Sequence, residues 1–165
     1  MTSEIKTTFL QWESVVSSFN NDNINTVPFK ESWTPGQVAE HLIKANSGIT
    51  KVLRGRVTDT KRDPEEKIPQ TNHIFLDFST KMKSPEQIVP TRTDHTTENL
   101  VSSIRQIKSD LLDVSEKEDL TKTCVDHQIP GMGDFTRGEW INFCLVHTQR
   151  HIHQLENIRR QMSVV

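Results

Sequence analysis

Residues 136–162 read TRGEWINFCLVHTQRHIHQLENIRRQM, and this stretch predicts one long amphipathic helix. Thr136 and Glu139, three positions apart, form a capping-box pattern at its start. Successive residues of a helix turn by about 100°, so one stripe of this helix faces the protein interior. That stripe contains Trp140, His147, His151, Gln154 and Ile158. His153 lies about 120° from His147 and is predicted to face outward.

Three other segments show the same periodicity. The first covers residues 3–19, the second begins at Thr34 and ends near Gly55, and the third covers residues 97–114. Thr34, Pro35 and Gln37 give the second helix a capping box with proline in its first turn. No segment alternates with period two for long. The sequence therefore predicts an all-α, four-helix bundle, and we expect residues 1–165 to form a single domain.

A long connection separates the second and third predicted helices. Residues 55–93 contain four prolines and scattered charge, with a capping pattern for one short turn at residues 84–87. A connection of this length suits a crossover between parallel neighbours in a bundle. Its charged runs, residues 61–63 and 65–67, mix signs and are predicted to be solvated surface.

Composition excludes several classes of protein. The formal net charge is −2, so no basic excess points to nucleic acid. No apolar run approaches the roughly 18 residues that a membrane span needs, and the N-terminus lacks an apolar signal core. We therefore expect a cytoplasmic protein that binds neither nucleic acid nor membrane. Cys124 and Cys144 form no metal or redox motif and are interpreted as reduced thiols.

Three histidines are predicted to face one interior. His41 lies between Val38 and Ala45 at helical spacing, and His147 and His151 are one turn apart. A buried polar group without a partner costs roughly 1–3 kcal/mol. A divalent metal would satisfy three neutral imidazoles together, and three protein ligands leave positions open for water or substrate. The residues alone leave a second interpretation open, because hydrogen-bonded core histidines produce the same spacing.

Two motifs resemble those of the DinB-like superfamily, which includes the YfiT-type bacillithiol transferases. WTPGQVAEHL, residues 33–42, is similar to the W-[ST]-x-x-x-[VIL]-x-x-H-[LI] signature. HTQRHIHQL, residues 147–155, resembles the H-x-x-x-H-x-x-Q motif, and residues 133–140 resemble its lead-in. Order and separation both match, and the helical pattern covers nearly the whole chain.

The resemblance implies a four-helix bundle with a long crossover and a divalent metal, nickel or zinc, on His41, His147 and His151. It also implies a thiol-dependent transferase that joins a low-molecular-weight thiol such as bacillithiol, mycothiol or glutathione to an electrophile, and a homodimer. His127 lies near a family His-Pro pair, but Gln128 follows it here, so no role is carried over to it.

Three functional hypotheses compete. In the first, a metal-bound thiolate attacks an electrophilic substrate, with a hydrolase as the variant that uses metal-bound water. In the second, the bundle is a non-enzymatic, stress-related protein that binds metal or a small ligand. In the third, the histidines are structural. Gln154, one turn beyond His151, is either a hydrogen-bond partner near the metal or a polar residue capping the core, and Glu40 is predicted to face solvent.

Overall fold

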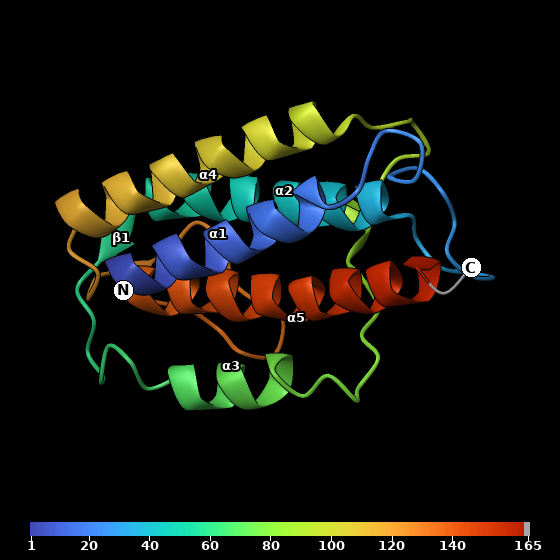
Figure 1. Cartoon of the computed structure of the whole chain (residues 1–165). Coiled ribbons are helices and arrows are strands. Elements are labelled where there is room, and N and C mark those ends of the chain that lie inside the picture. The colour runs from blue at the N-terminus through green and yellow to red at the C-terminus, as the bar shows by residue number, and fades with distance from the viewer. Residues whose placement is uncertain (164–165) are drawn as a thin grey trace.

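The computed structural model describes residues 1–163 and is mostly helical (Figure 1). Five α-helices follow in order: α1 (Thr2–Ser17), α2 (Pro35–Leu53), α3 (Ile68–Phe75), α4 (Thr97–Lys117) and α5 (Arg137–Ser163). A 3-10 turn covers Glu86–Ile88. Strands β1 (Val57–Thr58) and β2 (Thr123–Cys124) pair as a short antiparallel ribbon. The prediction of a helical fold is confirmed.

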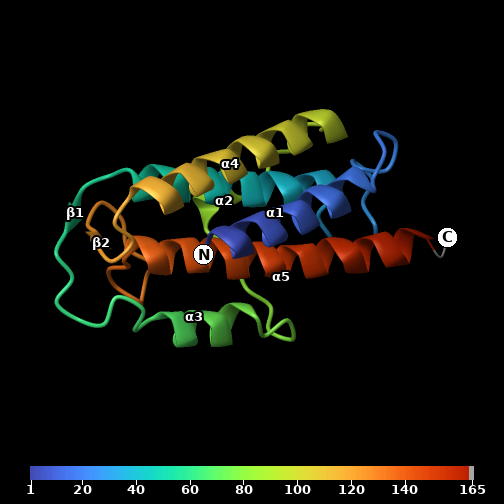
Figure 2. The ribbon, with the colours of Figure 1, turned by 60° about the vertical axis from the view of Figure 1, so that its left-hand side comes forward.

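The four long helices α1, α2, α4 and α5 pack around one apolar core. Helices α2 and α4 run in the same direction, opposite to α1 and α5 (Figure 1, Figure 2). The chain between α2 and α4 therefore has to return along the length of the molecule, and it does so past the outer side of α5, where α3 packs. The largest fully buried side chains include Trp12, Phe9, Phe135, Leu42, Ile104 and Leu155.

Capping boxes fix where the two histidine-bearing helices begin. At α2, the Gln37 backbone N–H donates to Thr34 Oγ1 at 3.1 Å, and the Thr34 N–H donates to Gln37 Oε1 at 3.0 Å. At α5, Thr136 and Glu139 make the same reciprocal pair at 3.1 and 2.9 Å. Both boxes predicted from the sequence are confirmed. They fix the residue at which each helix begins.

The long connection is more ordered than the sequence suggested. It contains α3, a helix that was not predicted, and strand β1, which pairs with β2 in the second loop. The expected short turn is present, two residues later than predicted, as the 3-10 turn Glu86–Ile88. Helix α3 has one fully buried residue, Thr71, so its stability depends on its packing against α5 rather than on a strong pattern of its own.

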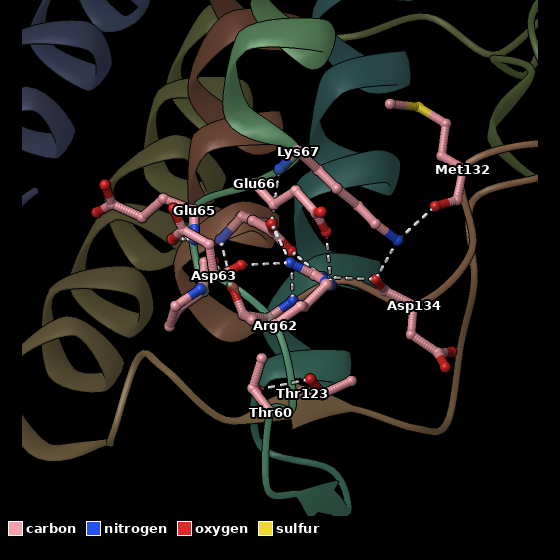
Figure 3. Close-up of polar contacts among 12 residues, drawn as sticks. Thr60, Arg62, Asp63, Glu65, Glu66, Lys67, Thr123, Met132 and Asp134 are labelled. Carbon is pink, nitrogen blue, oxygen red and sulfur yellow. Dashed lines mark hydrogen bonds and ion pairs between the residues drawn. The ribbon is translucent and has the colours of Figure 1, made fainter.

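Two charged residues of this connection, Arg62 and Lys67, are partly buried, which corrects the prediction of solvated surface for them. Lys61, Asp63, Glu65 and Glu66 are exposed, as predicted. The Arg62 guanidinium donates to both carboxylate oxygens of Glu139 at 2.6 and 2.7 Å, and the Glu139 side chain is only 1% exposed. The backbone N–H of Lys67 donates to the same carboxylate at 2.9 Å. The ammonium of Lys67 donates to the carbonyls of Met132 and Asp134 at 2.5 Å each (Figure 3). These contacts fasten the crossover to the start of α5.

Within residues 1–163, none of the helices combines the length and the apolar character that crossing a bilayer would require. This agrees with the absence of long apolar runs in the sequence.

We predict that Glu139→Gln lowers the free energy of unfolding by roughly 1.5–3 kcal/mol, because it removes the buried carboxylate that accepts charged hydrogen bonds from the half-buried Arg62. Burial alone would raise the pKa of Glu139, but hydrogen bonds from Arg62, Thr136 and Lys67 outweigh it and lower the pKa. The stabilisation by the ionised carboxylate is thus complete above the unfolded-state value near 4.5 and is lost as pH falls through the lower folded-state pKa. Urea unfolding at pH 7 and in acid measures the difference. Glu65→Gln, at an exposed neighbouring position, is the control, and an equal loss of stability in both variants would contradict the prediction.

Candidate metal centre

Three histidine rings meet between α2 and α5. His41 comes from the middle of α2, and His147 and His151 come from successive turns of α5. The Nε2 atom of His147 lies 3.3 Å from Nε2 of His41 and 3.1 Å from Nε2 of His151. Each ring offers one ligand atom, and these atoms all lie within 4.8 Å of one another. His41 and His147 are buried, with 3% and 7% exposure.

In His41 and His151, the other ring nitrogen, Nδ1, forms a hydrogen bond with a neighbouring group. His41 Nδ1 lies 2.9 Å from the carbonyl oxygen of Ile88, which can only accept a hydrogen bond. His151 Nδ1 lies 2.7 Å from Gln154 Oε1. In a neutral imidazole one nitrogen carries the hydrogen and the other the lone pair. Both rings therefore keep the hydrogen on Nδ1 and turn the lone pair of Nε2 towards the centre of the cluster.

His147 shows why hydrogen bonds do not fully satisfy this cluster. Its Nδ1 is buried and has no hydrogen-bond partner among the described residues. If His147 carried its hydrogen on Nε2, one N–H would be shared between two lone pairs, and Nδ1 would remain an unsatisfied acceptor. With the hydrogen on Nδ1, three lone pairs would face one another. A cation accepts all three, so the chemistry of this donor set fits a divalent ion such as nickel or zinc.

Aromatic side chains, rather than further hydrogen bonds, fix the orientation of the rings. Phe143 stacks on His147 with ring centres 5.6 Å apart and an interplanar angle of 13°. Phe75 meets the same imidazole edge-on at 5.9 Å, and Trp33 lies 5.2 Å from His41. This apolar shell excludes water from one side of the cluster and lowers the local dielectric.

The same burial keeps the imidazoles neutral. Desolvation lowers the pKa of His151 to about 4 and holds the pKa of His147 well below 6.5, and the neighbouring imidazoles and the Arg150 charge act in the same direction. Burial also lowers the pKa of His41, although its hydrogen bond to the Ile88 carbonyl opposes the shift. Neutral imidazole is the form that binds metal.

The predicted outward residue His153 lies outside the cluster. Its ring stacks on Phe78 with centres 4.5 Å apart. His127 is exposed and lies near Trp140, with ring centres 5.8 Å apart. The structure thus separates the three inward histidines from these two.

Glu40 was predicted to face solvent, but the structure places it against the crossover. Its side chain is 13% exposed and accepts hydrogen bonds from the backbone and hydroxyl of Thr91, both at 3.0 Å. It also pairs with Lys44, whose ammonium donates to the Val89 carbonyl at 2.9 Å. Together with the bond from His41 to Ile88, these contacts hold the end of the crossover against the turns of α2 that surround His41.

Arg150 holds the middle of the crossover, next to the two histidines of α5. Its guanidinium donates to the carbonyl oxygens of Phe75, Asp77 and Thr80. The Asp77 carboxylate in turn accepts from Ser79 and Thr80, which rounds off this turn. The segment after α3 is therefore held over the cluster by a residue that lies directly before His151.

A family model described as the DinB superfamily matches residues 5–155. The chain belongs to the DinB superfamily. Among curated proteins it is similar to the uncharacterized protein YuaE of Bacillus subtilis (strain 168), with 24% identity over 150 residues that cover 90% of each chain. No solved structure matches it significantly. The resemblance noted in the two histidine motifs is thus shown at the level of the family.

Several residues around this DinB site were not predicted from the sequence. Trp33 comes directly before the predicted cap of the second helix, where the sequence favours a packing role, and no role was predicted for Ile88 or Arg150. Ile88 contributes only a backbone carbonyl, which no side-chain pattern can reveal. Arg150 had one usable signal, because it lies within the motif between the two histidines of α5, but its carbonyl partners lie 70–75 residues away.

In metal-free protein, we predict that His151 titrates near pH 4 and that His41 and His147 titrate below the ordinary value of 6.5. Imidazoles of the unfolded chain titrate near 6.5, so the unfolded state binds more protons below that value. Stability should therefore fall as pH drops from about 6.5 towards 4. Nitrogen-15 NMR of the imidazoles measures both protonation and tautomer. Titration of His151 at its ordinary value, or a hydrogen on Nε2 of His41, would contradict this description.

We further predict that Arg150→Gln loosens the segment after α3, because it removes charge-assisted hydrogen bonds to three carbonyls. Each such bond contributes roughly 1.5–3 kcal/mol, so tryptic cleavage after Lys81 and Lys83 should be about tenfold faster or more. Mass spectrometry identifies the first cleavage sites. Arg159→Gln removes an exposed arginine of the same helix and should leave the rate unchanged. Equal rates in both variants would show that Arg150 does not hold this segment.

Proposed function

We propose that this DinB protein is a metal-dependent transferase that joins a low-molecular-weight thiol to an electrophile. His41, His147 and His151 would hold the ion, nickel or zinc. We also propose that residues 1–165 form one domain, in which the four long helices act as a single bundle and the segment between α2 and α4 as its crossover. The observation that carries the proposal is the convergence of three imidazoles, with Nε2 of His147 lying 3.3 Å from that of His41 and 3.1 Å from that of His151, at a largely buried site.

The protein's own residues prepare the site for a cation. The Ile88 carbonyl and Gln154 Oε1 fix the hydrogens of His41 and His151 on Nδ1, so the lone pairs point inward. Phe143 and Phe75 hold the His147 ring and keep water from its apolar side. When bound, a divalent ion stabilises the deprotonated form of a thiol or of water at neutral pH.

The protein's cysteines support an external thiol rather than a protein nucleophile. Both are free and fully buried. Burial raises the pKa of Cys124 to about 11 and that of Cys144 to about 12. Neither is a thiolate at neutral pH, and neither lines the cavity beside the histidines. A thiolate at this site therefore has to arrive with a cosubstrate.

We predict that His147→Ala and His151→Ala abolish retention of nickel or zinc, since each removes one of three ligands. Elemental analysis of purified protein, and calorimetric titration of chelator-treated protein with either metal, measure the loss. His153→Ala is the matched control on the same helix and should retain the ion. Equal loss in all three variants would contradict the assignment of the ligands. No uptake by the parent protein would support purely structural histidines.

Activity is tested on metal-loaded protein with a panel of thiols and a chromogenic or fluorogenic electrophile. Transfer that disappears in His151→Ala but persists in His73→Ala, at an exposed position of α3 outside the cavity, would support the transferase. Hydrolysis of ester or amide substrates without thiol would instead favour the hydrolase variant. Stoichiometric metal without either reaction would favour the non-enzymatic binding protein.

A further inference from the structure

A cavity of about 780 Å³ opens onto the histidine cluster. Its walls come from the loop before α2, the crossover, the second loop and α5, and the three histidines lie among its lining residues. Small-molecule sites have volumes of about 300–1,000 Å³ and combine an apolar lining with a few polar groups. The cavity therefore has the size and position of a substrate site whose reacting end lies at the histidines.

The lining is rich in aromatic rings. Trp33, Phe75 and Phe143 stand beside the histidines, with Phe75 and Phe143 in edge-to-face contact at 4.9 Å. Further along, Phe29 and Phe78 are 50% and 43% exposed and still line the cavity. Large apolar side chains that gather at one exposed place mark a binding surface. Their arrangement favours a ligand with a flat, apolar body.

Charge at the cavity is predominantly positive. Lys81, Lys83 and Arg150 line it, against one acidic residue, Glu31. Arg150 is already committed to three carbonyls of the crossover. Lys81 and Lys83 are exposed and make no ion pair or side-chain hydrogen bond with any described residue. Their charges are therefore available to a ligand.

We infer that the cavity selects an apolar, ring-bearing molecule that carries an acidic group, such as a carboxylate or sulfonate. The rings would lie between the aromatic side chains, and the acidic group would face Lys81 and Lys83. The inference rests on the proposed function only in placing the reacting end of the ligand at the metal site. The selectivity itself belongs to side chains outside the metal site.

The test compares two fluorescent probes with the same ring system on chelator-treated protein. One is 8-anilinonaphthalene-1-sulfonate, and the other is the uncharged N-phenyl-1-naphthylamine. We expect the sulfonate to bind roughly three- to tenfold more tightly, in line with two partly screened ion pairs, and this preference should vanish in high salt. The double variant Lys81→Gln/Lys83→Gln should lose the preference, whereas Lys6→Gln/Lys51→Gln, on exposed positions of α1 and α2, should keep it.

A second pair of variants tests the apolar part. Phe78→Ser should weaken both probes, and Leu10→Ser, at a 62% exposed position on α1, should weaken neither. Near-ultraviolet circular dichroism of the three tryptophans checks that each variant keeps its packing. Equal affinity for the two probes, or no effect of the lysine and Phe78 changes, would overturn the inference. If the protein were a dimer, and Phe78→Ser dissociated it without changing the affinity for either probe, the exposed apolar side chains at the cavity would instead be assigned to contact with a second copy of the chain.

Because the probes are measured without metal, the two proposals fail separately. If the parent protein bound no metal, the proposed function would be refuted, but the inference about probe selectivity would be unaffected. If the protein bound metal but showed no preference between the two probes, only the inference about the ligand would be refuted.

Discussion

Three imidazole nitrogens that lie within 4.8 Å of one another at a largely buried site impose the main constraint on this structure. Such an arrangement is fully satisfied when the rings are neutral, their lone pairs point inward and a cation accepts those lone pairs. Burial provides the first condition, because it lowers the pKa of all three histidines. Acceptors on Nδ1 provide the second for His41 and His151. The third is what a divalent ion would supply.

The crossover is part of the site because its residues contact and orient the histidines from outside the four long helices. It supplies the carbonyl of Ile88 to His41 and the ring of Phe75 to His147. In return, Glu40 and Arg150, each directly before a cluster histidine in the sequence, bind its backbone. The contacts that orient the histidines and those that hold the crossover are thus interleaved on the same helical turns. Disturbing one set is expected to disturb the other.

Much of the fold and the histidine cluster could be predicted from the sequence, because helical periodicity converts spacing into direction. The starts of α2 and α5 follow from their capping boxes, and the inward faces of His41, His147 and His151 follow from their spacing relative to the apolar residues of each helix. The same rule gave no information on Arg62 or Lys67. Their partners lie 65–77 residues away, so a mixed run of charges looked like solvated surface. Helix α3 was missed because it is short and has little apolar pattern of its own.

The histidines and many of the residues that shape the cavity lie on different parts of the chain. The residues that fit a metal lie on two long helices, where spacing determines geometry. Several of the residues that shape the cavity, among them Phe78, Lys81 and Lys83, lie on the crossover, where the chain has no regular period. A chain with the same helices and a different crossover would keep the histidine cluster but surround it with other side chains. In this architecture the histidine cluster belongs to the helices, whereas much of the cavity beside it is formed by the segment that connects them.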